Sequence, residues 1–381
     1  MKQIIVILVA AILILVGCTP KETVSGPKHN ASAKALIEKL RQTVADGKMM
    51  FVHQDDLMYG HNWRISPDEK SYEKSDVKNV CGKLPAMIGF DLGGIEMGDE
   101  KNLDSNYFYQ IRDAAIAHYK RGGAITLSWH PRNPLTGGDA WDISSDLVVS
   151  SIIPGGVLND KFEVWLTRLA EYLKTFKADG KKIPLIFRPW HEQTGSWSWW
   201  GTDICTAEEF QALWEYTYDF LTIKNGLTNL VWAYSPDRAS NLAILMDRYP
   251  GDEYIDIIGY DCYCGSPVRE VDDSDEQWAS KCADVAAAYT TRLSEGLDVL
   301  SAETARRGKI LALTETGSEG LKIHNWWTEV LYPVLEQYPV AYILAWRNAC
   351  DKPEHFYGPF AGGPNEEDFV AFAAKEKVQM L

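Results

Sequence analysis

The 381-residue sequence predicts an α/β protein in which a single (β/α)₈ barrel forms one folded domain. Two observations favour this fold. Short apolar runs rich in β-branched or aromatic residues alternate with longer amphipathic segments, as strand–helix units do. In addition, no low-complexity segment, charge block or proline-rich linker interrupts this alternation to mark a domain boundary.

Eight apolar runs are predicted to be the barrel strands. They lack the apolar–polar alternation of a half-exposed strand, which indicates burial on both faces, as in a parallel sheet. The runs are Met49–Val52, Ala86–Phe90, Ala124–Trp129, Pro184–Phe187, Leu230–Tyr234, Tyr254–Tyr260, Ile310–Thr314 and Tyr342–Trp346.

Four intervening segments are predicted to be helices, because their apolar residues recur at helical spacing. They are Asn106–Arg121, Phe162–Phe176, Glu208–Leu221 and Val330–Gln337. An open, doubly wound sheet is the alternative arrangement of such units. It usually carries a glycine-rich phosphate loop after its first strand, whereas here the polar residues His53–Asp56 follow the first run.

The N-terminus is typical of an exported lipoprotein. An uncharged apolar run, Ile4–Gly17, is short for a bilayer span and suits a signal peptide, and Leu15–Cys18 looks like a bacterial lipobox. We therefore predict a signal peptide in residues 1–17, a lipidated Cys18 with a flexible tether in residues 18–35, and the barrel in residues 36–381. The barrel would then lie in the periplasm or at the cell surface. An uncleaved anchor helix is the alternative.

Composition narrows the classes of ligand. The formal net charge of −15 argues against nucleic acid, whose phosphates require Lys and Arg. Fourteen tryptophans suit a sugar ligand, because aromatic faces stack on the C–H faces of a pyranose. The six cysteines beyond Cys18 allow many disulfide pairings, and none can be assigned. Cys262–Cys264 lacks the additional ligands that a zinc site needs, and no HExxH spacing occurs, so no metal is expected.

Polar residues follow nearly every predicted strand. In a (β/α)₈ barrel the catalytic groups stand at the C-terminal ends of the strands, so these side chains are expected on one rim. They are His53, Gln54, Asp55, Asp91, His130, Arg188, His191, Glu192, Asp237, Asp261, Tyr263, Glu315, Arg347 and Asn348.

Two carboxylates on this rim predict glycoside hydrolysis. Glu192 follows the fourth run and Glu315 ends the seventh. Such a pair can protonate the glycosidic oxygen and attack the anomeric carbon, with retention when the carboxyl groups lie roughly 5–5.5 Å apart and inversion at about 6.5–9.5 Å. The sequence leaves this separation open. Either glutamate alone could be a surface charge or a salt-bridged strand end; their matching placement favours a catalytic pair.

Five segments together resemble glycoside hydrolase family 26, a group of (β/α)₈ enzymes dominated by β-1,4-mannanases. Arg188–Gly201 looks like the acid/base segment of that family, and Thr314–Gly317 is similar to its nucleophile segment. Gly259–Tyr263 resembles its sixth-strand motif, and Ser128–His130 and Trp346–Asn348 also match. His191, which directly precedes Glu192, favours this family over related barrel glycosidases, many of which carry asparagine at that position.

The resemblance implies a retaining mechanism without metal or organic cofactor. Glu192 would be the general acid/base and Glu315 the nucleophile, with Tyr263 orienting Glu315 by a hydrogen bond. Trp197 and Trp346 would form stacking platforms. The other residues expected to bind substrate or to hydrogen-bond within the site are His130, Arg188, His191, Asp261 and Arg347.

The sequence thus predicts a lipid-anchored, monomeric endo-β-1,4-mannanase whose partners are β-mannan chains and, through the lipid alone, a membrane. Alternatives within the same chemistry are exo-acting release of mannobiose, or action on mixed-linked β-glucan or β-1,3-xylan. Two long loops, Pro131–Gly156 and Asn348–Pro364, are expected to shape the distant sugar subsites and so to decide between attack at a chain end and internal attack. A non-catalytic glycan-binding lipoprotein is the alternative from another class; it has no need of the Glu192–Glu315 pair.

Overall fold

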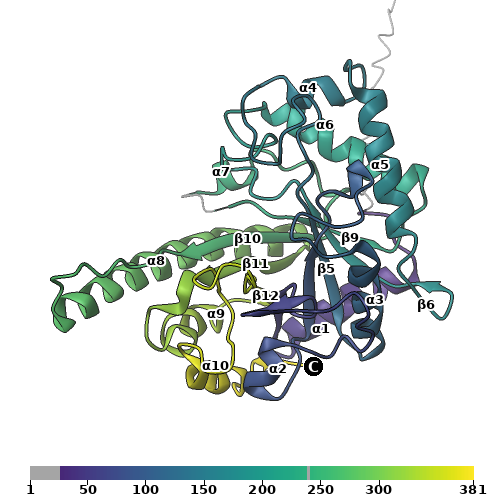
Figure 1. Ribbon diagram of the computed structural model, residues 1–381. Coiled ribbons are helices and arrows are strands. Elements are labelled where there is room, and N and C mark those ends of the chain that lie inside the picture. Colours follow the sequence, from purple (N-terminus) through teal and green to yellow (C-terminus); the bar gives the residue numbers. More distant parts are fainter. Residues whose placement is uncertain (1–25, 238–240) are drawn as a thin grey trace, which may run out of the picture.

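The computed structural model describes residues 26–237 and 241–381, and the predicted signal peptide and Cys18 lie outside them. Eight parallel strands of the described residues close into a barrel, because the last strand pairs with the first (Figure 1). The predicted (β/α)₈ fold is confirmed. In barrel order the strands are β1 (Met49–Gln54), β4 (Met87–Asp91), β5 (Ala124–Trp129), β8 (Leu185–Pro189), β9 (Leu230–Tyr234), β10 (Ile257–Cys264), β11 (Ile310–Ser318) and β12 (Val340–Ala345).

Each predicted apolar run overlaps one of these strands, and β5 and β9 have the predicted bounds. The main differences are at β10 and β11, which continue to Cys264 and Ser318. Their pairing persists beyond the end of the apolar run, after a register shift at Tyr260, so that Asp261 lies opposite Glu315. Polar residues expected just after these strands therefore lie within a paired, rigid segment.

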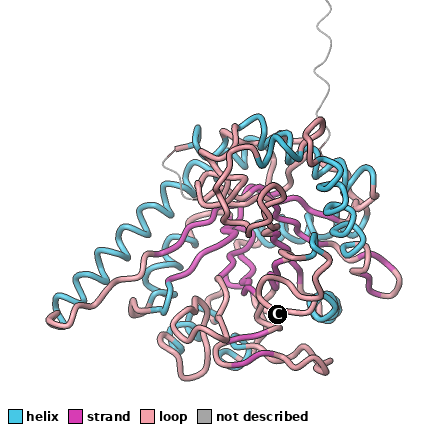
Figure 2. Tube along the Cα trace, turned by 45° about the horizontal axis from the view of Figure 1, so that its top comes forward, coloured by secondary structure: helices cyan, strands magenta, loops and turns pink. Residues whose placement is uncertain are grey.

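Helices surround the barrel, as the cyan and magenta tubes of Figure 2 show. Three predicted helices correspond to α3 (Phe108–Lys120), α5 (Asn159–Leu173) and α6 (Ala207–Tyr218), and the fourth overlaps α9 (Tyr332–Leu335). The other short helices are α2 (Asp76–Cys81), α4 (Val148–Ile152), α7 (Leu242–Met246) and α10 (Glu366–Ala373), with π-helical turns at Asp219–Lys224 and Trp326–Leu331 and 3₁₀ turns at Ile95–Met97 and Glu319–Leu321. Short strands outside the barrel wall are β2 (Tyr59–Gly60), β3 (Trp63–Arg64), β6 (Lys177–Ala178), β7 (Lys181–Lys182) and β13 (Val378–Gln379).

Most of the tryptophans belong to the packing between the barrel and its helices. Eight of them are almost fully buried, and they form aromatic contacts such as Trp326 with Trp327, whose ring centroids lie 4.7 Å apart. Their high number therefore largely reflects the core. The eight are Trp129, Trp190, Trp199, Trp200, Trp214, Trp232, Trp326 and Trp327.

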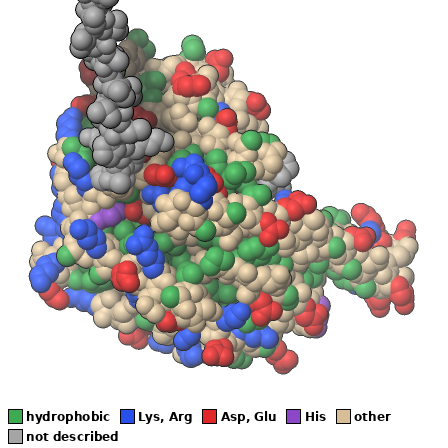
Figure 3. Space-filling view, turned by 180° about the vertical axis from the view of Figure 1, so that it is seen from behind, with side chains coloured by type: hydrophobic (Ala, Val, Ile, Leu, Met, Phe, Trp, Pro, Cys, Tyr) green, Lys and Arg blue, Asp and Glu red, His purple; other side chains and the backbone are tan. Residues whose placement is uncertain are grey.

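The 33-residue helix α8 (Asp275–Arg307) is the most extended element. A capping box formed by Ser274 and Gln277 begins it, and Gly308, at φ 66°, ends it in the left-handed conformation. Its C-terminal part packs on the barrel through Tyr289 and Leu293, whereas its N-terminal part projects from the body (Figure 1). Seen from behind, the end of this projection carries acidic side chains (Figure 3). No helix among the described residues has the length and apolar character needed to cross a bilayer.

Helix α1 (Ala31–Ala45) closes the end of the barrel at which the strands begin. The side chain of Asn30 caps it by accepting a hydrogen bond from the backbone N–H of Ala33 at 3.0 Å. Leu36 and Leu40 pack with residues of the barrel interior. Ser32 Oγ donates to the carbonyl of Lys182, just before β8, at 3.2 Å. This helix begins within residues 18–35, the range predicted as tether, so the ordered body starts before residue 36.

We expect Leu40→Ala to lower the free energy of unfolding by about 2–5 kcal/mol, because the fully buried side chain seals the barrel interior and its loss leaves a cavity. Urea denaturation followed by circular dichroism measures this change. Glu38→Ala, on the exposed side of the same helix, is the control and should change stability by no more than about 0.5 kcal/mol. Equal effects of the two substitutions would contradict the role assigned to α1.

Candidate active site

The two predicted catalytic glutamates meet at the C-terminal rim of the barrel. Glu192 follows β8, and Glu315 lies on β11. One carboxylate oxygen from each of Glu192, Asp261 and Glu315 lies within 4.8 Å of the others. This close approach of Glu192 and Glu315 fits the short separation of retaining glycosidases better than the wider gap of inverting ones.

An unusual backbone presents Glu192 to the rim. Trp190 and Glu192 both have positive φ, at 52° and 56°, a conformation that costs energy in residues other than glycine. The N–H of Glu192 donates to the carbonyl of Ser235, the residue after β9, at 2.7 Å. The indole of Trp197 donates to Glu192 Oε2 at 2.9 Å. A Cβ at Gly195 would lie 2.2 Å from the ring of Trp197, so this turn requires glycine.

The environment of Glu192 favours its protonated form. Burial raises its pKa well above the ordinary value, and the nearby carboxylates of Glu315 and Asp261 raise it further. The hydrogen bond from Trp197 acts in the opposite direction, since it stabilises the charged form. Glu192 is therefore suited to hold a proton at neutral pH and to donate it.

Glu315 is held by a different set of contacts. Arg188, on β8, donates to Glu315 Oε1 through Nη2 and to Asp261 Oδ2 through Nη1, the latter at 2.8 Å. The phenol of Tyr263 donates to Glu315 Oε2 at 2.6 Å. His191 Nε2 lies 3.8 Å from Glu315 Oε1. The cation and the phenol bind both oxygens of Glu315 and fix its direction, which a nucleophile requires.

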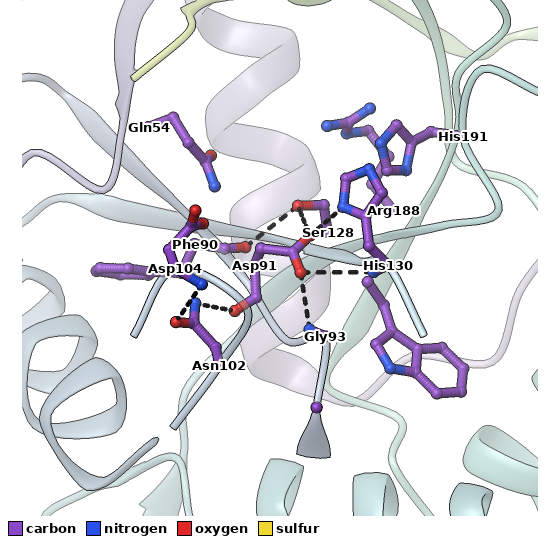
Figure 4. A network of polar contacts seen from close by, with 12 residues as sticks. Gln54, Phe90, Asp91, Gly93, Asn102, Asp104, Ser128, His130, Arg188 and His191 are labelled. Carbon is purple, nitrogen blue, oxygen red and sulfur yellow. Dashed lines mark hydrogen bonds and ion pairs between the residues drawn. The ribbon is translucent and has the colours of Figure 1, made fainter. Parts of the chain in front are cut away.

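His130 and His191 form one wall beside Glu315. Their rings are nearly perpendicular, with centroids 4.4 Å apart. Asp91 accepts from Nδ1 of His130 at 2.7 Å and also from Ser128 Oγ and the backbone of Gly93 (Figure 4). Burial opposes protonation of His130, but the Asp91 carboxylate outweighs it and raises its pKa. Burial and the neighbouring Arg188 lower the pKa of His191 well below the usual range, so His191 is neutral.

Aromatic surfaces border this wall. Trp141, which is 47% exposed, stacks on His130 at a centroid distance of 5.3 Å. A cavity of about 370 Å³ opens beside the pair. Trp197 and Trp346, the predicted platforms, are partly buried, and the backbone N–H of Trp346 is bound to the carbonyl of Thr316 at 3.0 Å. The other tryptophans of the acid/base segment, Trp190, Trp199 and Trp200, belong to the core.

Arg347 lies farther along the same rim. It donates to the phenol of Tyr59 at 3.2 Å and forms an ion pair with Asp104. Burial lowers the pKa of this guanidinium, but Tyr59 and Asp104 outweigh that effect and raise it. The structure thus gathers every predicted site residue except Cys18 at one end of the barrel, with Arg347 and Trp346 following β12.

Tyr263 and Arg188 were expected to contact the site, but other residues that orient it escaped sequence reasoning. Asp91 stood in the set of polar strand ends, yet nothing in the sequence connected it with His130. Ser235, Asp104 and Trp141 carried no signal of their own, since each becomes relevant only through a partner distant in the chain. For a cation, the described residues offer the cluster of Glu192, Asp261 and Glu315, where the Arg188 guanidinium already forms ion pairs with two of the carboxylates.

Comparison with known proteins agrees with this geometry. Residues 33–305 match the family model described as glycosyl hydrolase family 26. A mannan endo-1,4-β-mannosidase from Bifidobacterium adolescentis is 32% identical over 379 residues, which cover 93% of this chain and 35% of that protein. A mannan endo-1,4-β-mannosidase from Bacillus subtilis is 32% identical over 51% of this chain and 55% of its own length.

The solved structure of a GH26 β-mannanase from Bacteroides ovatus matches with a TM-score of 0.81 and 39% identity, covering 92% of this chain and 95% of that one. The chain spans between about a third and a little over half of the length of the two curated relatives. The sequence motifs, the barrel and the family model agree, and the resemblance is confirmed: the chain belongs to glycosyl hydrolase family 26.

Proposed function

We propose that this protein is a retaining endo-β-1,4-mannanase that hydrolyses mannan, galactomannan or glucomannan as a monomer. The observation that carries the proposal is the approach of two carboxyl groups in different environments: burial and nearby carboxylates favour the protonated form of Glu192, whereas Glu315 is paired with the Arg188 guanidinium. The names of its relatives support mannan as the substrate class, since these are mannan endo-1,4-β-mannosidases.

In the first step, Glu315 attacks the anomeric carbon while Glu192 donates its proton to the glycosidic oxygen. The C–O bond to the leaving chain breaks, and a glycosyl ester forms on Glu315. In the second step, Glu192, now a carboxylate, removes a proton from water, whose oxygen attacks the anomeric carbon and releases Glu315. Arg188 and Tyr263 keep Glu315 oriented in both steps.

A reducing-sugar assay on galactomannan, glucomannan, lichenan and β-1,3-xylan tests the substrate class. Activity on the two mannans is expected, whereas activity on lichenan or β-1,3-xylan alone would assign the chain to another substrate of the same chemistry. A time course of product lengths distinguishes internal cleavage, which first gives long fragments, from exo-acting release of mannobiose. Binding to mannan without hydrolysis would favour a glycan-binding protein.

The lipobox supports an attachment of the protein to a membrane through a lipidated Cys18. Mass spectrometry of the mature N-terminal peptide tests this proposal, because a diacylglyceryl modification adds a defined mass to Cys18. Cys18→Ala should move the protein from the membrane fraction to the soluble fraction. Protease treatment of intact cells then distinguishes the cell surface from the periplasm.

Trp197→Phe should move the basic limb of the kcat/KM profile to higher pH. The basic limb of this profile reports the acid form of the free enzyme, and the substitution removes the hydrogen bond that lowers the pKa of Glu192. We expect kcat/KM at neutral pH to fall about tenfold through loss of this bond. Trp199→Phe is the matched control, because the Trp199 indole donates to the carbonyl of Pro131 instead. A basic limb that stays in place or moves to lower pH would contradict the assignment.

A further inference from the structure

One buried serine is connected by hydrogen bonds to both glutamates, directly to the backbone of Glu192 and through other side chains to Glu315. Ser235 directly follows β9, the strand between β8 and β10, and its side chain is inaccessible to solvent. Glu192 follows β8, and Asp261 lies on β10. Ser235 therefore stands between the backbone that carries the acid/base and the carboxylate that neutralises Arg188.

The carbonyl of Ser235 fixes the backbone of Glu192. It accepts a hydrogen bond from the Glu192 N–H at 2.7 Å. The Gln193 side-chain amide, oriented with its nitrogen toward the carbonyls, also donates to this oxygen at 3.2 Å and to Trp190 O at 3.1 Å. Because Trp190 and Glu192 both adopt costly positive φ values, such contacts are needed to hold the turn.

The hydroxyl of Ser235 acts on the other glutamate through Asp261 and Arg188, and it also accepts a hydrogen bond directly from Arg188 Nη1 at 3.3 Å. Ser235 Oγ donates to Asp261 Oδ1 at 2.7 Å, and Asp261 Oδ2 accepts from Arg188 Nη1 at 2.8 Å. The other nitrogen of Arg188, Nη2, donates to Glu315. Ser235 Oγ also lies 2.7 Å from the hydroxyl of Thr314, the residue before Glu315.

We infer that Ser235 is a positioning residue that sets Glu192 and Glu315 relative to each other, through its carbonyl on one side and through Asp261 and Arg188 on the other. The inference rests on the proposed function, since it assigns roles to the same two glutamates. The Ser235 hydroxyl holds the Asp261 carboxylate against Arg188, and Asp261 in turn holds the guanidinium in the position from which it binds Glu315.

The hydrogen bond from the Ser235 hydroxyl affects the protonation of Asp261, which lies among several charged groups. The pKa of Asp261 is raised to about 7, because burial and the Glu315 carboxylate together outweigh Arg188, Thr314 and Ser235, which lower it. Other charged or titratable groups facing this site are Glu192 after β8, Asp237 after β9 and Tyr342 on β12. Loss of the Ser235 hydroxyl raises the pKa of Asp261 further, so a larger fraction of Asp261 is protonated at neutral pH. Arg188 then loses one of the two carboxylate partners that hold it in place, the other being Glu315.

Ser235→Ala tests the inference, because it removes the hydroxyl and keeps the carbonyl. We expect kcat to fall roughly 10- to 100-fold with KM changed less than about twofold, and the acidic limb of the pH profile to move upward. The fall in kcat should be equally large with an aryl β-mannobioside, whose phenol leaves without protonation. The reason is that the substitution does not affect proton donation by Glu192. Ser235→Thr, which keeps a hydroxyl, should recover most of the activity.

Ser151→Ala is the matched control, since it removes a buried hydroxyl on α4 that donates only to the carbonyl of Val148. It should leave kcat, KM and the pH profile unchanged. Wild-type activity or an unshifted acidic limb in a folded Ser235→Ala protein would overturn the inference. A fall in kcat that is seen on polysaccharide but not on the aryl substrate would also overturn it, because that result would mean that the hydroxyl acts on proton donation by Glu192.

A measurement without substrate separates this inference from the proposed function. Asp261 has a raised pKa in the folded state, so its contribution to stability falls as pH rises through that pKa. Ser235→Ala should therefore lower Tm, relative to wild type, more at about pH 8 than at about pH 5, whereas the Ser151→Ala difference should be the same at both. A wild-type protein inactive on every glycan would overturn the proposed function, and a pH-independent Tm difference for Ser235→Ala would overturn the inference.

Discussion

Glu315→Ala is expected to reduce kcat on mannan by on the order of 10⁴- to 10⁶-fold, the largest effect of any single substitution in this chain. The variant lacks the group that bonds to the anomeric carbon, so neither step of the proposed mechanism can proceed. Arg188 and Tyr263 lose their common acceptor at the same time. Initial rates of reducing-sugar release from galactomannan measure the loss.

Added azide extends this experiment to stereochemistry. Alanine leaves a space on the face from which Glu315 attacks, and azide entering there should convert an aryl β-mannobioside to the α-mannosyl azide. Glu319→Ala is the matched control, because Glu319 lies four residues farther along, is half exposed and pairs with His355. It should retain near wild-type activity. Residual activity of Glu315→Ala above about 1% would show that another group is the nucleophile.

Glu192→Ala is expected to give the second largest effect, a fall of roughly 10²- to 10⁴-fold in kcat/KM on polysaccharide. The leaving mannosyl oxygen needs a proton, whereas an acidic phenol does not. With an activated aryl β-mannobioside, formation of the glycosyl ester should therefore stay close to the wild-type rate. Its hydrolysis should be slow, because no base remains to activate water. A burst of phenol followed by a slow steady state measures both steps.

Azide should abolish the slow phase of Glu192→Ala and give the β-mannosyl azide, since this nucleophile needs no base. The same variant should be more stable than wild type at about pH 8. Because the pKa of Glu192 is higher in the folded than in the unfolded state, the free energy of unfolding falls as the pH rises above the unfolded-state pKa. Alanine does not ionise, so the variant does not lose this stability. Equal losses on polysaccharide and on the activated substrate would assign the proton donor to another residue.

The barrel was predictable because its strands are buried on both faces. The run Leu230–Tyr234 contains no charged, amide or small hydroxyl side chain that would blur its bounds, and β9 coincides with it. The extension of β10 and β11 was not predictable from hydropathy. Those segments stay paired because each supplies the backbone partner of the other, although Asp261 and Glu315 interrupt the apolar pattern. Similarly, helix α1 begins within the range predicted to be a flexible tether. Its first turns are stabilised by packing against the end of the barrel, and the local sequence does not show this contact.

The pair Glu192 and Glu315 was predictable because both follow the same rule of strand ends. The division of the tryptophans was not. Trp197 and Trp199 are two residues apart in one segment, yet the first contacts Glu192 and the second lies in the core. The positive φ values at Trp190 and Glu192 decide which indole faces the site, and no residue preference announces them.

Helix α1 has a consequence for the direction in which the site faces. The described chain enters at the end of the barrel that α1 closes, where Lys28 donates its N–H to the Tyr218 phenol at 2.9 Å and His29 contacts Asp256. Glu192 and Glu315 open at the opposite end. The first described residues and the two glutamates therefore lie at opposite ends of the barrel. If the proposed attachment and activity are right, the protein is fastened on the side away from its rim, and the rim faces outward to a long glycan.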